Sequence, residues 1–112
     1  MFIIKEPGDY SFDKIGHRGK IFPSESVNNK TQFILLEIEN GIDVTLCQHE
    51  CDYAYYVLEG RGFFEINGAR ENCGVGDLVV IPAGNRFTYK GKMKMFLNCT
   101  PPWTEAQEET IN

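Results

Sequence analysis

Turn signals at short, regular spacing are the feature that most constrains the fold of this chain. Asn40-Gly41, Glu59-Gly60, Asn67-Gly68 and Pro82-Ala83-Gly84 separate short runs of β-branched, aromatic and aliphatic residues. A spacing of about eight to twelve residues between such signals is typical of all-β sandwiches and barrels. Asn67-Gly68 favours a two-residue hairpin, because both positions of that turn require a positive φ. The pattern therefore predicts an all-β chain.

The runs between these signals predict individual strands. We expect strands at residues 31–39, 43–49, 53–58, 62–66, 75–81, 86–89 and 92–98. No segment sustains the 3.6-residue periodicity of a helix, and the single candidate is one capped turn from Thr104 to Gln107. The first two dozen residues are expected to form irregular strands along the edge of the barrel. We expect one domain over residues 1–112, with the barrel core at roughly 31–100.

Charge and hydropathy exclude several classes of protein. The formal net charge is -5, and no basic cluster of the kind that nucleic-acid binding requires is present. No apolar stretch has the length needed to span a bilayer, and the first residues lack the basic start and apolar core of a signal peptide. We therefore expect a cytoplasmic protein that binds neither nucleic acid nor membrane. Its four cysteines are then expected to be reduced thiols.

Two stretches resemble the paired motifs of the cupin superfamily. The first runs from Gly41 to Gly60 and closes with Tyr-Val-Leu-Glu-Gly, and the second runs from Gly76 through Gly-Asp-Leu-Val-Val-Ile-Pro-Ala-Gly to Phe87. The resemblance implies a cupin-type double-stranded β-helix barrel, also called a jelly-roll. The glycines also suit strand boundaries on physical grounds, since a barrel corner needs backbone freedom.

The resemblance also implies where a metal would bind, and this chain departs from that pattern. The ligand positions of the family fall on Cys47, His49, Tyr53 and Phe87. Only His49 keeps the family residue, and Cys47 could act as a thiolate ligand beside it because residues two apart on a strand face the same way. Cys51 continues the alternation, but the expected turn directs it away. We favour no metal, and a divalent zinc, iron, nickel or manganese ion held by His49 and Cys47 is the alternative.

The residues that stand in place of the family's metal ligands give the barrel an aromatic interior. Tyr53 and Tyr55 share one face of their strand, as Phe87 and Tyr89 share one face of theirs. Aromatic faces with a few polar groups suit a small organic ligand, such as a sugar-like ring or another metabolite. Side chains that simply fill the barrel are the other interpretation. The predicted ligand-binding residues are His49, Tyr53, Tyr55, Phe87, Tyr89 and, at the rim, Arg86.

Three functions remain open from the sequence. The favoured one is a small-molecule-binding barrel without the usual metal site. The second is an enzyme of a kind known among cupins: an isomerase or epimerase, a lyase or a dioxygenase. In that enzyme His49 would be the base and Tyr53 or Tyr89 the acid, or His49 and Cys47 would remain as metal ligands. The third is a dimerisation scaffold. We expect a homodimer in which edge strands are covered.

The remaining polar residues have simpler interpretations. His17 is interpreted as a solvated histidine at a strand edge, and Lys90, Lys92 and Lys94 as protection of an edge strand against aggregation. Trp103 is expected to pack the tail onto the barrel or onto a second subunit. The acidic residues of the tail, Glu105, Glu108 and Glu109, are expected to form a solvated face.

Overall fold

A computed structural model describes residues 3–111 of the chain, and within that range the regular structure is almost entirely strand. Two single turns of 3-10 helix, η1 (Glu25–Val27) and η2 (Glu105–Gln107), complete it. The all-β prediction is confirmed. None of the helical turns in residues 3–111 has the length and apolar character that a membrane-crossing helix needs. The strands are β1 (Phe12–Lys14), β2 (His17–Ile21), β3 (Gln32–Ile38), β4 (Thr45–Gln48), β5 (Asp52–Ile66), β6 (Ala69–Gly74), β7 (Leu78–Ile81), β8 (Arg86–Thr100) and β9 (Glu108–Ile111).

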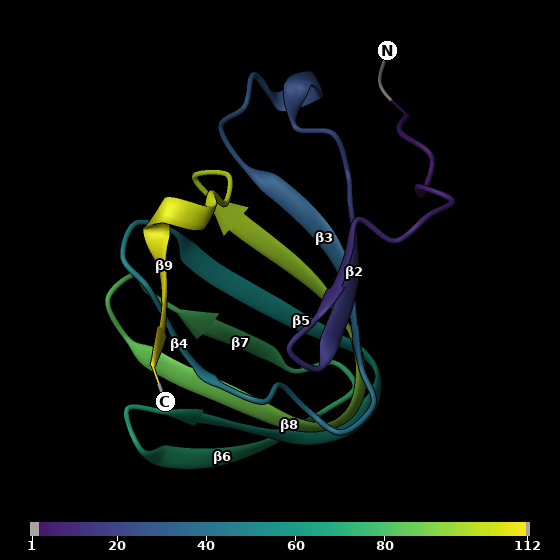
Figure 1. The fold of residues 1–112 in the computed structure, drawn as a ribbon. Helices are drawn as coiled ribbons and strands as arrows, with labels where there is room; N and C mark the ends of the chain where they lie inside the picture. Colours follow the sequence, from purple (N-terminus) through teal and green to yellow (C-terminus); the bar gives the residue numbers. More distant parts are fainter. Residues whose placement is uncertain (1–2, 112) are drawn as a thin grey trace.

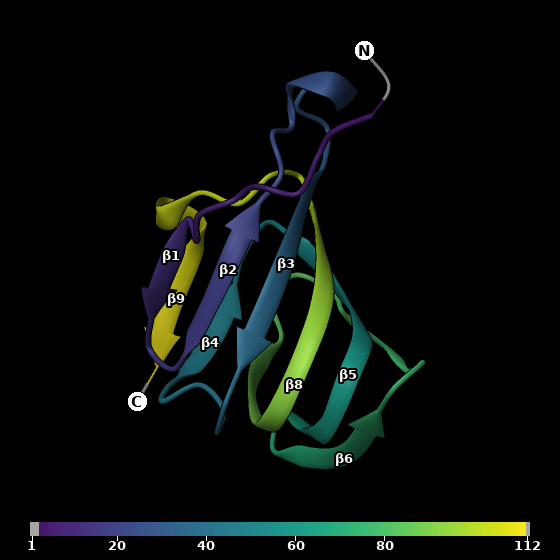
Figure 2. The same cartoon turned by 90° about the vertical axis from the view of Figure 1, so that its right-hand side faces the viewer.

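Two long antiparallel strands, β5 and β8, organise the sheet (Figure 1). On one half of the molecule the order is β1-β2-β3-β8-β5-β7, which Figure 2 shows in succession from β1 to β5. On the other half β8 pairs with β4, which pairs with β9, and β5 pairs with β6. The same two strands therefore belong to both halves of a curled sheet. The inner side chains of the halves face one another across the interior.

Glycines allow β5 and β8 to bend together between the two halves. Gly60 has φ +81, and a Cβ built there would lie 2.0 Å from the carbonyl oxygen of Lys92. Gly91 has φ +118, and a Cβ there would lie 2.6 Å from the carbonyl oxygen of Arg61. Only glycine tolerates both the positive φ and the close approach. A register shift between Val57 and Glu59 adds a bulge at the same bend.

The bend explains one wrong prediction about strand number. The expected strands at residues 53–58 and 62–66 are one strand, β5, and those at residues 86–89 and 92–98 are one strand, β8. The glycines were interpreted as ends, but they curve the strands while ladder pairing continues on both sides. The Asn67-Gly68 turn is confirmed, with φ of 51 and 85 at its two residues. The capped turn at Thr104–Gln107 is also confirmed, as a 3-10 turn with a capping box.

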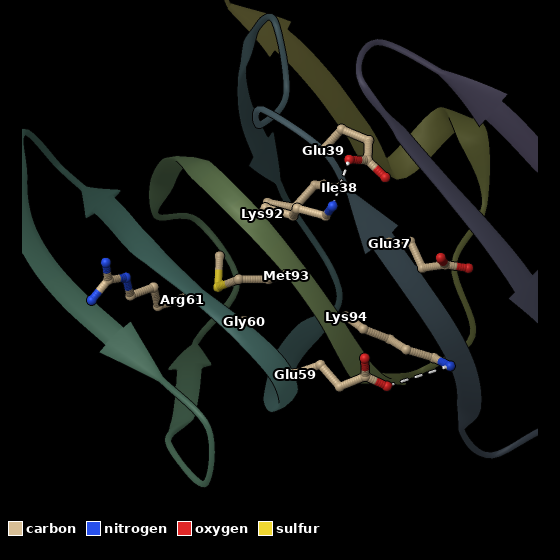
Figure 3. Close-up of a pocket in the computed structure, with 9 residues that line it drawn as sticks. All are labelled: Glu37, Ile38, Glu39, Glu59, Gly60, Arg61, Lys92, Met93 and Lys94. Atoms are coloured by element: carbon tan, nitrogen blue, oxygen red, sulfur yellow. Dashed lines mark ion pairs between the residues drawn. The ribbon is translucent and has the colours of Figure 1, made fainter.

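The edge-protection interpretation of the alternating lysines is wrong. They lie on β8, which is flanked by β5 on one side and by β3 and β4 on the other. Lys92 pairs with Glu39 at 3.5 Å and Lys94 with Glu59 at 3.9 Å, and Figure 3 shows these pairs around a depression at the bend. Both pairs are solvent-exposed, so each contributes little to stability.

Inward-facing side chains from both halves form one core. Alternate residues in the first part of β5 are buried, as are alternate residues along most of β8. Tyr55, Phe64, Phe87 and Tyr89 are among the largest fully buried side chains, so aromatic rings dominate the centre. Their contacts are edge-on or tilted for most pairs, which is the favoured geometry for neighbouring rings.

Candidate functional site

A cavity of about 330 Å³ opens between the two halves of the sheet, at the end that the C-terminal segment (residues 101–111) covers. This volume is at the lower end of the range for small-molecule pockets. Its walls come from β1, β2, β3, β4, β5 and β8 and from the C-terminal segment. The lining residues are Ser11, Phe12, Lys14, His17, Ile21, Ile34, Leu36, Leu46, Tyr53, Tyr55, Tyr89, Leu97, Cys99, Trp103, Glu105 and Glu108.

Three buried tyrosines line this cavity. Tyr53 and Tyr55 project from the same face of β5, and their rings meet edge-on with centroids 5.8 Å apart. Tyr89 on β8 lies beside Tyr55, with ring centroids 5.4 Å apart. Burial raises the pKa of all three phenols. They therefore stay protonated and act as neutral hydrogen-bonding groups.

His17 lies against this group of tyrosines. Its Nδ1 is 2.8 Å from the hydroxyl of Tyr89, although the two residues are far apart in the sequence. Burial, with a smaller contribution from the charge of Lys14, lowers the pKa of His17 to about 4. The imidazole is therefore neutral at physiological pH and can accept a proton.

The interpretation of His17 as a solvated edge residue is corrected by this placement. β2 pairs with β1 on one side and β3 on the other, so it is an interior strand. The glycines among the first two dozen residues predict irregular strands, and this prediction obscures the alternation along β2. The signal that could have placed His17 is its position two residues from Gly19 and four from Ile21, on a strand that turns one face inward.

The C-terminal segment forms the outer wall of the cavity. Trp103, Glu105 and Glu108 line it, and the hydroxyl of Tyr53 donates to Glu108 Oε2 at 2.8 Å. Lys14 from β1 lies over the Trp103 ring, with Nζ 5.5 Å from the ring centroid. The prediction that Trp103 packs the tail onto the barrel is confirmed. Glu108, in contrast, does not belong to a solvated face, because β9 pairs with β4 and turns it inward.

A buried amide pair holds this segment in place. Gln48 is 2% exposed, and its Nε2 donates to Gln107 Oε1 at 3.1 Å. Its Oε1 accepts the backbone N–H groups of Glu50 and Cys51, at 2.8 and 2.9 Å. Gln107 Oε1 also accepts the backbone N–H of Thr104. These bonds join the β4–β5 turn to the wall that carries Trp103 and Glu108.

The structure brings together three of the predicted ligand-binding residues, Tyr53, Tyr55 and Tyr89, and places the others elsewhere. Phe87 is 1% exposed and packs behind the cavity, edge-on to Tyr53. Arg86 lines a separate surface depression with Thr45 and Asn67. Arg86 points to that surface because it lies three residues before Tyr89 on the same strand, and residues an odd number apart face opposite sides of a sheet.

His49, the leading candidate of the sequence analysis, also lies outside the cavity. Its side chain is 54% exposed, and its Nε2 is 3.0 Å from Glu109 Oε1. It follows the last residue of β4, where the chain turns toward β5 and the alternation of inward and outward residues ends. The physical reason for its position is therefore the end of the strand. Tyr53 and His49 do not face each other across one pocket.

The four positions that the family uses for metal do not converge in this chain. Cys47 Sγ is 4.0 Å from His49 Nδ1, but Tyr53 and Phe87 lie inside the barrel while His49 faces the surface. Within residues 3–111, no three or more His, Cys, Asp or Glu side chains are grouped closely enough to hold a metal ion. The donor set therefore does not fit a metal at these positions.

The cysteines are thiols in the structure. Cys51 turns toward the C-terminal segment, where its Sγ donates to the carbonyl oxygen of Pro101 at 2.8 Å. Burial raises the pKa of Cys51 to about 11 and also raises that of Cys99. Protonated, buried thiols of this kind are poor nucleophiles.

The curled antiparallel sheet and its enclosed interior define a small cupin-type β-barrel, which confirms the resemblance read from the paired motifs. Among solved structures, a Streptomyces PAC13 variant with a histidine-to-glutamine substitution, determined with uridine, is similar over 100% of this chain and 92% of its own, with a TM-score of 0.90 and 24% identity. Pac13, described as a unique nucleoside dehydratase, matches over 93% of this chain and 84% of its own, with a TM-score of 0.85 and 26% identity.

More distant structures share the same fold. Ectoine synthase from P. lautus matches over 90% of this chain and 80% of its own, with a TM-score of 0.72 and 17% identity. No protein-family model and no curated protein sequence matches the chain. The similarity therefore establishes the fold, and the activity has to be argued from the cavity.

Proposed function

We propose that this protein is a lyase that binds a nucleoside-like molecule in the cavity and removes water from it. One observation carries the proposal: the imidazole of His17 meets the hydroxyl of Tyr89 at 2.8 Å among the side chains that line an aromatic cavity. The fold supports it, since Pac13 is described as a nucleoside dehydratase and related structures contain uridine. Those related structures carry substitutions of a histidine and of tyrosines, the residue types gathered here.

His17 would carry the proton in this reaction. Elimination of water removes a hydrogen from one carbon and a hydroxyl from its neighbour, leaving a double bond. A neutral imidazole can take the proton, and an imidazolium with a pKa of about 4 readily returns it to the departing hydroxyl. The proton taken from carbon then leaves as part of the water molecule, so the enzyme ends in its starting state.

The tyrosines would hold the substrate and orient the imidazole. The hydroxyl oxygen of Tyr89 lies 2.8 Å from His17 Nδ1 and can accept the Nδ1–H, which fixes the tautomer whose Nε2 lone pair is free to take the proton. Tyr55 packs beside Tyr89, with their ring centroids 5.4 Å apart, and it lines the same cavity. Their low-polarity surroundings strengthen each of these interactions.

Binding and turnover test the proposal separately. Trp103 is the single tryptophan of the chain and lines the cavity, so its fluorescence reports ligand binding directly. We expect uridine to change that fluorescence in a saturable way. Turnover is measured by mass spectrometry, as the loss of one water from nucleosides that carry a carbonyl group two carbons from a hydroxyl, since the carbonyl acidifies the intervening C–H.

The His17→Asn variant tests the assigned role. We expect turnover to fall by about 100-fold or more, the usual contribution of a general acid–base group, with little change in uridine binding. His49→Asn is the matched control, because His49 lies outside the cavity, and it should keep full turnover. Unchanged turnover in His17→Asn would contradict the assignment.

The alternative is a binding protein without chemistry. It has the same cavity and the same ligand class, and it predicts uridine binding with no dehydrated product from any nucleoside offered. The aromatic lining and the closed outer wall favour binding under either function. The proton-carrying contact between His17 and Tyr89 is what favours an enzyme.

A further inference from the structure

Glu108 lines the cavity as a charged group, and the proposed proton transfer does not use it. It is half-buried on β9, it lines the cavity, and its Oε2 accepts the hydroxyl of Tyr53 at 2.8 Å. Its negative charge contributes to the raised pKa of Tyr53, Tyr55 and Tyr89, which line the same cavity. A carboxylate placed this deep in an aromatic cavity needs hydrogen-bond donors around it.

The hydrogen bonds within the cavity show which atoms remain available to a ligand. Tyr53 donates its hydroxyl proton to Glu108, so that proton is already committed to the protein. Glu108 has two oxygens with about four lone-pair sites, of which Tyr53 uses one. This wall of the cavity therefore presents mainly acceptors, and it fits a ligand that brings donors.

The residues around Glu108 indicate which hydrogen-bond donor groups a ligand would bring to it. Trp103 lies on the same wall, and Phe12 also lines the cavity, so the cavity has aromatic surface against which a planar ring can pack. Glu105 is a second acid at the mouth, and Lys14 is the lining residue that carries a positive charge. Two carboxylates against one ammonium disfavour a phosphate or carboxylate on the ligand. Neutral hydroxyl groups are the donors that fit.

We propose that Glu108, held in place by Tyr53, recognises two hydroxyl groups on neighbouring carbons of a ribose-like ring. The two oxygens of one carboxylate match the spacing of such a diol, and an acidic residue plays this part for ribose in dinucleotide-binding folds. The inference rests on the proposed function, because it names the part of a nucleoside that the cavity selects. It assigns Glu108 to binding and leaves proton transfer to His17.

A ligand series on the unaltered protein is the first test. Binding of uridine, 2′-deoxyuridine and 3′-deoxyuridine is measured by Trp103 fluorescence and by calorimetry. Each deoxynucleoside is expected to bind roughly ten- to a hundred-fold more weakly than uridine, the usual effect of losing a hydrogen bond to a charged group. Uridine 5′-monophosphate is expected to bind more weakly as well.

Variants of the carboxylate connect this preference to Glu108. In Glu108→Gln the affinities of the three nucleosides should converge to within about threefold, because the amide accepts through one oxygen only. Glu109→Gln is the matched control: it removes the same charge from the adjacent residue, which pairs with His49 outside the cavity. It should keep the preference for uridine in full.

The outcomes separate this inference from the proposed function. If uridine and both deoxynucleosides bind with equal affinity, the role of Glu108 is overturned while nucleoside binding stands. If the preference persists in Glu108→Gln, another residue recognises the diol and the assignment is overturned. If uridine fails to bind the folded protein at millimolar concentration, the proposed nucleoside ligand is wrong and this inference falls with it.

Discussion

At the scale of single residues, His17 shows most clearly how the fold alters ordinary chemistry. Its pKa is lowered from 6.5 to about 4, first by burial and then by the charge of Lys14. Asp13 on the same hairpin acts in the opposite direction with a smaller effect. The only local signal for its inward position is its even spacing from Gly19 and Ile21 on β2. Its partner, Tyr89, is 72 positions away in the chain.

The lowered pKa of His17 has a consequence for stability against pH. Between pH 6.5 and 4 the unfolded chain binds a proton at this histidine and the folded chain does not. The free energy of unfolding should therefore fall as pH drops through this window, by up to about 3 kcal/mol from this group. Urea unfolding at pH 7 and pH 4 measures it.

The His17→Asn variant isolates this contribution from the other titrating groups. The variant should lose less stability than the parent between pH 7 and pH 4, because asparagine has no proton to gain. Equal losses in the two proteins would show that His17 is not held neutral by the fold.

At the scale of elements, the bend shared by β5 and β8 gives the sheet its enclosed interior. Gly60 on β5 and Gly91 on β8 lie near that bend, each with positive φ and with a carbonyl oxygen close to where a Cβ would be. The bend places both halves of each long strand around one cavity. Tyr55 and Tyr89 consequently meet although they lie on different strands.

Substitution of Gly91 by alanine tests this account. A Cβ at this position would lie 2.6 Å from both Arg61 O and Gly62 Cα, at φ +118. We expect Gly91→Ala to lower the free energy of unfolding by at least about 2 kcal/mol. Gly74→Ala is the matched control on β6, where the nearest atom is 3.9 Å away, and it should change stability by about 0.5 kcal/mol or less. Similar unfolding midpoints for the two variants would contradict the role of the bend.

At the scale of the whole molecule, one outer face of the sheet is unusually apolar. Tyr56 on β5 and Leu78 on β7 are cross-strand partners, and they are 44% and 60% exposed. Leu58 and Val80 extend this face at 38% and 55% exposure. Contiguous apolar surface of this kind marks interaction sites more often than isolated exposed residues do.

The homodimer expected from the sequence remains a prediction, and this face is where we place it. A second copy of the chain can bury the same patch through a two-fold axis, since such an interface is self-complementary. Light scattering at micromolar concentration should give twice the monomer mass, and Leu78→Lys should reduce it to the monomer. Thr110→Lys is the control, because Thr110 is exposed on β9, away from the patch. A monomeric parent protein would contradict the prediction.

The sequence alone determined the all-β class and the hairpin at Asn67-Gly68, because turn chemistry and alternation act over a few neighbouring residues. The cupin-type frame followed from the resemblance of the paired motifs. It also placed Tyr53, Tyr55 and Tyr89 inside the barrel, since residues two apart share a face of a strand.

Only the tertiary structure decided which polar groups join those tyrosines. His49 turned outward where β4 ends, while His17 and Glu108 turned inward from the two ends of the chain. The physical reason is that β2 and β9 take their places through pairing with β3 and β4, and no local pattern encodes which strands become neighbours. The regularly spaced turns thus determine that the chain is all-β, and long-range strand pairing determines which side chains meet.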